Sequence, residues 1–343
     1  MEIQSAAMRP VALWLFACCG MVVAMMLIGA ITRLTESGLS MVEWRPLIGA
    51  LPPFSEAEWQ RIFDLYRQTS EYRLQNAGMT LAEFKTIFWW EYIHRLWGRL
   101  IGIVFAVPFL WFVLRRQVRG RLTLTLFGLF LLGAAQGVIG WWMVKSGFAD
   151  RTDVSQYRLA IHLGLAFLIL GCLLWVALGL LPGEPAAKPV APVIRRGAVA
   201  VLVLISVTVL SGGLVAGLNA GYAYNDWPLM NGQVVPVEIF DQVPVWLNFF
   251  ENVATVQFDH RLLAYLTAAG VLLLWAAALR HRMAAATRRP LDLLLAMTAV
   301  QIALGVFTLV MVVPIHLAVL HQAGAIAVFC LAVWAVHRLR YAA

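Results

Sequence analysis

The sequence predicts an all-α integral membrane protein in which eight transmembrane helices form two pseudo-symmetric four-helix bundles. The first observation is composition: 62% of the 343 residues are hydrophobic, 13% are charged, and the mean hydropathy is +0.79. The second is a series of apolar runs of about 20 residues, the length at which a helix crosses a bilayer. The third is that polar motifs of the first half return in order in the second. The runs show little alternation, which argues against a β-barrel.

Eight apolar runs are the candidate spans, and the basic residues between them indicate their direction. The runs cover residues 11–31, 88–113, 122–143, 157–181, 197–218, 254–279, 291–313 and 315–337. Basic residues flank one side of the threaded spans: Arg9, Arg115, Arg116, Arg119, Arg121, Lys188, Arg195, Arg196, Arg280, Arg282, Arg288, Arg289, Arg338 and Arg340. The positive-inside rule makes this side cytoplasmic, with both termini inside. The net charge of +8 is therefore a topology signal, and nucleic acid is not expected as a partner.

A bacterial inner membrane is the expected location. The first apolar run begins close to the N-terminus and no small-residue cleavage site follows it, so we interpret it as an anchor rather than a cleaved signal. The four cysteines, Cys18, Cys19, Cys172 and Cys330, all lie inside apolar runs. A disulfide in the external loops and a CxxC redox motif are therefore excluded, and the thiols are interpreted as small buried side chains.

A linker rich in Pro, Ala and Gly divides the chain into two halves, residues 1–190 and 191–343. The string "EYIHRLWGRLIG" from Glu91 aligns with "QFDHRLLAYLTA" from Gln257. Other pairs follow in the same order: Gly29 with Gly212, Gln136 with Gln301, Gly140 with Gly305, and His162 with His321. Both halves begin on the cytoplasmic side, which predicts a parallel repeat. Each half is expected to be a four-helix bundle with a site in its core.

The two long external loops differ. The first, residues 32–87, contains "SEAE" from Ser55 and "TLAE" from Thr80, both of capping-box form. After the first box, large apolar side chains recur at helical spacing at Trp59, Ile62, Phe63 and Tyr66. This pattern predicts an amphipathic helix that lies on the outer membrane surface or caps the bundle. The second loop, residues 219–253, is shorter.

Four of the seven histidines lie in alternate spans, within roughly two turns of their outer ends. They are His94, His162, His260 and His321. The other three are expected outside the sites: His281 and His337 solvated in basic segments, and His316 in a short external turn. Polar groups within a membrane tend to face the bundle interior and mark functional sites. The four histidines are therefore expected at one depth near the external face, two in each half.

Two imidazoles on facing helices suit six-coordinate heme iron, which takes one axial ligand on each side. Zinc is a weaker candidate because it usually takes three or four protein ligands and no thiol is available. A proton relay would not require matched pairs, and a single histidine in a span is more often a hydrogen-bonded structural residue. Arg95 and Arg261 directly follow ligand candidates and are candidate contacts for heme propionates. The alternative for these arginines is anchoring at the membrane interface.

The two halves differ one turn before a candidate ligand, where Glu91 in the first half corresponds to Gln257 in the second. Glutamate and glutamine are nearly isosteric, but only glutamate exchanges a proton or carries charge. Residues three apart share a helix face, so Glu91 is expected beside the first site. This predicts a reaction site in the first half and a permanent electron-transfer heme in the second. The alternative is a carboxylate solvated among lipid headgroups.

The strings "ITRLTESGLSMVEWRPLIG", "EYIHRLWGRLIG", "RLAIHL", "QFDHRLLA" and "VLHQ" resemble the heme A synthase family, closest to its mitochondrial and alphaproteobacterial branch. The resemblance covers about residues 10–337 and implies two pseudo-symmetric bundles that oxidise the C8 methyl of heme O to the formyl group of heme A. It implies that His260 and His321 hold a prosthetic heme b. It also implies that His94 and His162 hold the substrate heme, with Glu91 essential to the chemistry.

The family reaction implies two successive hydroxylations and loss of water from a geminal diol, with electrons passing through the second heme to an unidentified acceptor. Expected partners are heme O, membrane lipid, heme O synthase and oxidase assembly factors, and a homo-oligomer is a further expectation. Many family members carry a cysteine pair in the first external loop, but this chain has none, and Met41 stands near the expected place. A thiol step in that loop is therefore excluded.

Two other functions compete with this interpretation. A bis-histidine b-type cytochrome that only transfers electrons would explain the four histidines but would leave the difference between Glu91 and Gln257 without a role. A heme or metal transporter would use the histidines as a transient path. The pigment separates these functions, because only the synthase changes the heme chemically.

Overall fold

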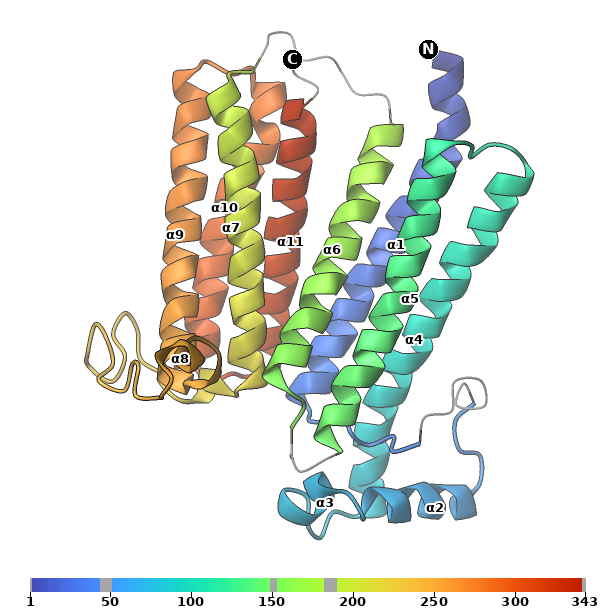
Figure 1. Ribbon diagram of the computed structural model, residues 1–343, viewed down its shortest axis with the longest axis vertical. Helices are drawn as coiled ribbons and strands as arrows, with labels where there is room; N and C mark the ends of the chain where they lie inside the picture. The colour runs from blue at the N-terminus through green and yellow to red at the C-terminus, as the bar shows by residue number, and fades with distance from the viewer. Residues whose placement is uncertain (1, 44–50, 149–152, 182–189, 341–343) are drawn as a thin grey trace.

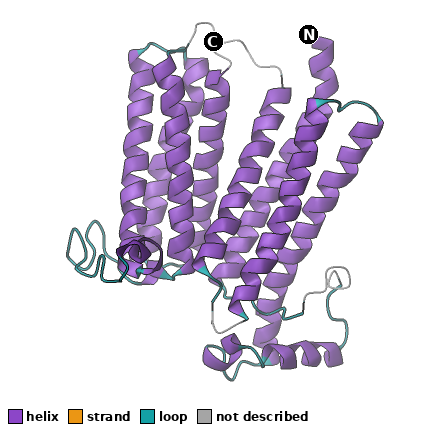
Figure 2. Ribbon diagram, viewed as in Figure 1, coloured by secondary structure: helices purple, strands orange, loops and turns teal. Residues whose placement is uncertain are grey.

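The computed structural model describes residues 2–43, 51–148, 153–181 and 190–340. Within these ranges the chain forms helices, turns and loops and no strand (Figure 2). Eight helices are long and apolar enough to cross a membrane. The all-α, eight-span prediction is therefore confirmed.

The eight long helices contain all eight predicted apolar runs apart from a few terminal residues. They are α1 (Glu2–Leu34), α4 (Leu81–Leu114), α5 (Arg121–Gly147), α6 (Gln156–Leu180), α7 (Pro192–Gly217), α9 (Val253–Arg280), α10 (Ala285–Val310) and α11 (Ile315–Arg340). Between them lie three short helices, α2 (Glu56–Tyr66), α3 (Ser70–Leu74) and α8 (Asn248–Glu251). We call the end of the molecule that carries these short helices the loop end, and the opposite end, where the two chain termini lie, the terminal end (Figure 1).

The long helices form two bundles that stand side by side (Figure 1). In the first, α1 packs against α4 and α6, and α5 packs against the same two helices. In the second, α7 packs against α9 and α11, and α10 packs against the same two. The helices α4 and α6 are therefore diagonal in one bundle, as are α9 and α11 in the other. These diagonal helices are the ones that carry the four candidate histidines.

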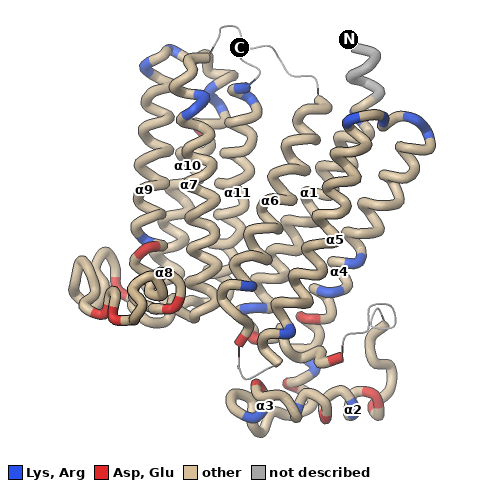
Figure 3. Tube along the Cα trace, in the orientation of Figure 1, with Lys and Arg blue, Asp and Glu red and all other residues tan. Residues whose placement is uncertain are grey.

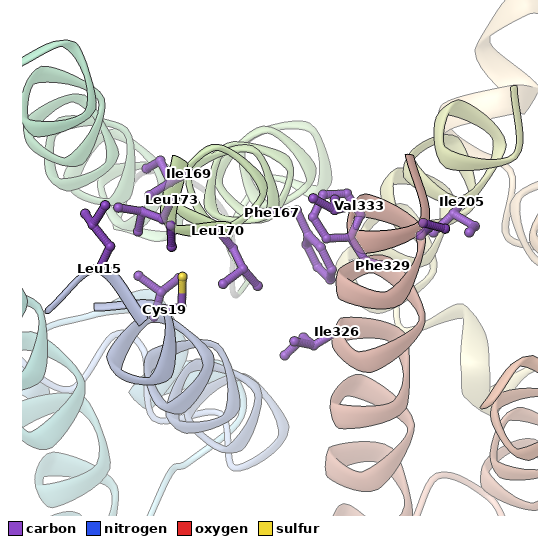
Figure 4. Packing of buried hydrophobic residues seen from close by; sticks show 14 of the residues in the cluster. Leu15, Cys19, Phe167, Ile169, Leu170, Leu173, Ile205, Ile326, Phe329 and Val333 are labelled. Atoms are coloured by element: carbon purple, nitrogen blue, oxygen red, sulfur yellow. The ribbon is translucent and has the colours of Figure 1, made fainter. Parts of the chain in front are cut away.

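The bundles are joined mainly by α6, which packs against both α7 and α11. In the close-up of Figure 4, Phe167 of α6 faces Phe329 of α11, and their ring centroids are 5.1 Å apart. Near the loop end a Cβ added to Gly217 would lie 2.6 Å from the Cα of Gln156, so only glycine permits this approach of α7 to α6. Small residues at such contacts are typical of membrane helices, whose association depends on close packing.

Polar contacts also join the two bundles at the loop end. Arg33, near the end of α1, donates to the Oδ1 of Asn219 at 2.9 Å and to the carbonyl of Ala216 at 3.0 Å. Asn219 in turn donates to Asp153 at 3.1 Å. These contacts connect residues from three separate segments and hold the first bundle against the second beside the candidate sites.

The first external loop packs on the protruding start of α4. The helix begins at Leu81, seven residues before the predicted run, and the predicted capping box of Thr80 and Glu83 is complete. The amphipathic helix α2 is also present. An aromatic cluster fastens α2 to α4: Trp59, Phe63, Tyr66, Phe84, Phe88 and Tyr92. Of the two predicted placements for this helix, the structure supports the one in which it caps the first bundle.

Charged side chains are distributed unequally between the two ends (Figure 3). Lysine and arginine dominate the terminal end, whereas the acidic residues gather mainly at the loop end. The predicted basic residues that the structure describes therefore share one end of the molecule, as the threading requires, and Lys188 lies outside the described residues. The assignment of that end to the cytoplasm remains a prediction.

Three histidines lie outside the candidate sites, and one of them differs from the prediction. His281 is exposed as expected, and His316 is exposed in the first turn of α11 rather than in a loop. His337, however, is only 8% exposed. Its ring stands edge-on to Trp175 of α6, with centroids 5.0 Å apart. The prediction that His337 is solvated was wrong because α6 covers this face of α11.

Candidate functional site

The four candidate histidines form two pairs, one in each bundle. His162, His260 and His321 lie six or seven residues after the first residue of their helices. His94 lies thirteen residues into α4 because that helix protrudes beyond the bundle. His94 is close enough to His162 for the two imidazoles to interact electrostatically, and His260 is likewise close to His321. The structure thus brings together the pairs that the repeat predicts.

Each of the four imidazoles lies against a glycine of a neighbouring helix. The pairs are Gly29 with His94, Gly140 with His162, Gly212 with His260, and Gly305 with His321. A Cβ added at any of these glycines would lie 2.9–3.1 Å from a ring atom. Any larger residue would therefore displace the imidazole, which explains why these glycines occupy matching places in the two halves.

Polar contacts hold the second pair more completely than the first. The Nδ1 of His260 lies 2.8 Å from the hydroxyl of Ser211, and the Nδ1 of His321 lies 3.1 Å from the amide nitrogen of Gln301. In the first bundle Gln136 donates to the backbone carbonyl of His162 at 2.9 Å. The Nδ1 of His162 is buried without a hydrogen-bond partner among the described residues.

Glu91 is buried at the loop end of the first bundle, and its side chain is 2% exposed. One carboxylate oxygen accepts hydrogen bonds from the Ser40 hydroxyl and the Met41 amide, both at 2.7 Å. The other oxygen accepts a hydrogen bond from Arg95, one turn further along α4. The alternative of a carboxylate solvated among headgroups is therefore wrong.

The matching position in the second bundle has the same arrangement with an amide. The Oε1 of Gln257 accepts a hydrogen bond from Arg261 at 2.9 Å, as Glu91 does from Arg95. The Nε2 of Gln257 donates to the Ala220 carbonyl at 2.7 Å. The arginine one turn later and the contact with the preceding loop are thus repeated, and the carboxylate of one bundle is replaced by an amide in the other.

The two arginines that follow the histidines are held by protein groups. Arg261 donates to three carbonyls of the second external loop: those of Tyr224, Asp226 and Leu229, at 2.9–3.1 Å. Arg95 donates to the Met41 carbonyl at 3.1 Å as well as to Glu91. Both arginines therefore fasten a loop to a helix beside a histidine. Their predicted contacts with heme propionates remain predictions.

A cavity of about 200 Å³ opens beside Glu91 at the loop end. The loop after α1, Arg95 of α4 and the end of α5 line it: Met41, Val42, Arg95, Trp141, Val144, Lys145 and Phe148. Its two cationic side chains, Arg95 and Lys145, suit a carboxylate-bearing ligand. Lys145 was not a predicted site residue, and the sequence signal for it is weak, since it is one lysine at the end of an apolar run.

The donor set fits a heme iron in each bundle. Two imidazoles approach from diagonal helices, each seated against a glycine, which matches one axial ligand on each side of a planar group. Among the described residues no three His, Cys, Asp or Glu side chains converge. The geometry therefore does not support a zinc site, which would need three or four protein ligands.

Comparison with known proteins finds relatives that match nearly the whole chain. The sequence model of the COX15-CtaA family, described as cytochrome oxidase assembly protein, matches residues 12–333. The chain is 56% identical over 337 residues to the heme A synthase of Rhodospirillum centenum, covering 98% of this chain and 90% of that protein. It is 50% identical to the heme A synthase of Nitrosospira multiformis over 98% of this chain and 95% of that protein. It is 51% identical to that of Parvibaculum lavamentivorans, with coverages of 96% and 94%.

Proposed function

Because the chain belongs to the heme A synthase family, we propose that its two bundles have different functions: the first oxidises heme O, and the second holds a permanent heme b. The chain is a multi-pass membrane oxidoreductase of heme biosynthesis that converts heme O to heme A. The alternative function, a b-type cytochrome that only transfers electrons, is not favoured, because the relatives that match nearly the whole chain are named heme A synthase.

The observation that carries this division is the buried carboxylate of Glu91. Ser40, Met41 and Arg95 hold it beside His94, whereas an amide, Gln257, occupies the matching place in the second bundle. A positioned carboxylate can accept a proton or stabilise developing positive charge. An amide can do neither, so the acid–base chemistry belongs to the first bundle.

In the first bundle His94 and His162 would hold the iron of the substrate between α4 and α6. The bound iron would be the redox centre through which the electrons of the methyl group leave, on their way to the acceptor. The hydroxyl of Ser40 and the amide of Met41 fix the direction of the Glu91 carboxylate, and Arg95 donates to its other oxygen. Glu91 then receives the proton released from the reacting methyl group, or balances the positive charge that develops there.

In the second bundle His260 and His321 would hold heme b between α9 and α11. Gln257 keeps Arg261 in place without introducing a charge, which suits a site that only transfers electrons. An unidentified acceptor takes the electrons onward.

The protein lies in a bacterial inner membrane with the loop end, and both heme sites, near the periplasmic face. Heme O synthase and oxidase assembly factors are the proposed protein partners, and a homo-oligomer is a further proposal.

Glu91→Gln tests the proposal. The substitution keeps the side-chain volume, and glutamine already occupies the matching position, so folding and heme b binding should be retained. Loss of a positioned acid–base group typically costs about 10²–10⁴-fold in rate. We expect the variant to accumulate heme O and very little heme A, measured by chromatography of extracted hemes.

Glu83→Gln is the matched control, because Glu83 is an exposed carboxylate on the same helix, outside the site. It should form heme A at the wild-type level. Wild-type amounts of heme A in Glu91→Gln would remove Glu91 from the mechanism and with it the assignment of the reaction to the first bundle.

A further inference from the structure

We propose that Ser211 is a positioning residue that fixes the His260 imidazole and makes the heme of the second bundle permanent. The first bundle has no equivalent hydroxyl, and its heme therefore exchanges as substrate and product. This inference rests on the proposed function, because it takes His260 as a ligand of heme b. Ser211 itself takes no part in the oxidation.

The hydrogen bonds of Ser211 determine which nitrogen of His260 carries the proton. The Ser211 hydroxyl donates to the carbonyl of Thr208 at 2.7 Å. When its one hydrogen is given to this carbonyl, the hydroxyl acts as acceptor towards the Nδ1 of His260, 2.8 Å away, which is the arrangement that ligation through Nε2 requires. The proton of a neutral imidazole is therefore held on Nδ1. The lone pair of Nε2 is left free for a metal.

Ser211 belongs to a chain of hydroxyls between α7 and α9. The Thr208 hydroxyl donates to the Leu204 carbonyl at 2.9 Å and lies 2.9 Å from the hydroxyl of Thr267 on α9. Thr267 is 6% exposed. In the bilayer core such groups must be satisfied internally, which fixes their geometry. The side chains of Ser211, Thr208 and Thr267 thus form a rigid hydrogen-bonded group next to His260.

The first bundle has apolar residues at all three matching positions. Ser211 directly precedes Gly212, which faces His260, and Ile28 directly precedes Gly29, which faces His94. Thr208 lies four residues before Gly212, and Met25 lies four residues before Gly29. Thr267 lies seven residues after His260, and Ile101 lies seven residues after His94.

The difference extends to the histidine rings. Ile28, at the place that corresponds to Ser211, has no hydroxyl to offer the ring of His94. In the described part of the chain the Nδ1 of His162 is buried without a hydrogen-bond partner. The glutamines Gln136 and Gln301 both donate to the backbone carbonyl of a histidine, but the amide nitrogen of Gln301 also lies 3.1 Å from the Nδ1 of His321. Both rings of the second pair thus have a polar side chain at Nδ1, and at His260 that side chain is Ser211, where the first bundle has Ile28.

A hydrogen bond at the second nitrogen has two effects on a metal-bound imidazole. It fixes the orientation of the ring, and it raises the basicity of the ligating nitrogen. Loss of such a partner typically costs about 10–100-fold in metal affinity. A more basic ligand also favours ferric over ferrous iron, which lowers the reduction potential. The two bundles can therefore both bind heme but release it at different rates.

The test compares Ser211→Ala with Ser206→Ala in the full-length purified protein. Ser206 is on the same helix, and its hydroxyl donates to the Leu202 carbonyl at 2.8 Å, away from the histidines. Transfer of heme b to excess apomyoglobin reports its rate of release, and an optical redox titration reports its midpoint potential. Ser211→Ala should release heme b about 10–100-fold faster and show a more positive potential. Ser206→Ala should match the wild type.

Two further substitutions keep the test informative if Ser211→Ala folds poorly. Ser211→Thr retains the hydroxyl and should restore slow release and the wild-type potential. Ser211→Cys retains a small side chain with a weaker acceptor and should lie between the wild type and Ser211→Ala.

His260→Ala separates failure of this inference from failure of the proposed function. If His260→Ala retains heme b, the ligand assignment is wrong, and the role of Ser211 is wrong with it. If His260→Ala loses heme b, but Ser211→Ala and Ser211→Cys keep the wild-type release rate and potential, the inference about Ser211 alone is overturned.

Discussion

At the scale of single residues, the contact between Gly140 and His162 is among the tightest in the candidate sites. A Cβ at this position would lie 2.9 Å from the Cε1 of the imidazole, so Gly140→Ala should push the ring out of place. We expect heme A formation to fall at least about tenfold, because misplacement by about 1 Å can cost 10²-fold. Chromatography of extracted hemes, at equal protein amounts, measures the effect.

Gly137→Ala is the matched control for this prediction. Gly137 lies one turn earlier on α5, and an added Cβ there would meet no atom within 4 Å. It should therefore leave heme A formation unchanged. Equal activity in Gly140→Ala and Gly137→Ala would show that the close contact with His162 does not matter to the reaction.

The residues of the candidate sites were predictable to the extent that they repeat. His94, His260 and the difference between Glu91 and Gln257 follow from aligned motifs in the sequence. The contacts of Glu91 with Ser40 and Met41 were not predictable, because they join positions 50 or 51 residues apart through a loop of irregular structure.

At the scale of elements, the short helix α3 carries a buried acid. Glu71 is 2% exposed, and one of its carboxylate oxygens has no hydrogen-bond partner among the described residues. Burial, and then the negative charge of Glu91, raise the pKa of Glu71 to about 8, whereas a hydrogen bond with Tyr66 lowers it. Glu36 and Asp153 also face this carboxyl group and raise its pKa. The folded loop therefore favours the neutral acid.

This raised pKa predicts how stability depends on pH. Between an unfolded pKa of about 4.5 and a folded pKa of about 8, the folded state binds the proton more tightly than the unfolded state. Stability contributed by Glu71 is thus complete below pH 4.5 and is lost as the pH rises through 8, by on the order of a few kcal/mol. Glu71→Gln should be more stable than the wild type at pH 8, with little difference at pH 4.5.

Thermal unfolding of the purified protein across this pH range measures the effect. Glu56→Gln is the control, because the Glu56 side chain is 73% exposed on the neighbouring helix α2. If Glu71→Gln and the wild type show parallel melting temperatures at every pH, Glu71 is not a buried neutral acid in the folded protein.

Helix positions were more predictable than helix ends. Hydropathy located all eight spans, but it placed the start of the second at residue 88. The true start of α4 at Leu81 is marked by the capping box of Thr80 and Glu83. Its first turns are apolar mainly on the face that buries Phe84 and Phe88 against α2. A hydropathy average cannot detect such a one-sided helix, because its polar face cancels its apolar face.

At the scale of the whole molecule, the basic residues at the terminal end predict the orientation in the membrane. A cysteine introduced at the exposed Gln117, between α4 and α5, should face the cytoplasm, whereas one at the exposed Gln68, beside α3, should face outward. A membrane-impermeant maleimide applied to intact cells should therefore label Gln68→Cys only. Labelling of Gln117→Cys to the same extent would contradict the orientation and place the candidate heme sites near the cytoplasmic face.

The arrangement in two bundles was also predictable from the sequence, because eight spans, a linker and recurring motifs allow few alternatives. The way the bundles meet was not. The contact of α6 with α7 and α11 depends on a glycine that fits against Gln156, and on Phe167 meeting Phe329 across 162 positions of sequence. No periodic pattern indicates such a pairing.

Extraction and chromatography of the hemes from purified protein test the central claim, that one bundle oxidises heme O while the other keeps heme b. The wild type should yield heme B together with hemes O and A. His94→Ala should retain heme B and form no heme A, whereas His260→Ala should lose heme B, because each histidine belongs to a different site. A wild type that yields only unmodified heme B, or variants of both bundles that lose the same single heme, would contradict the account.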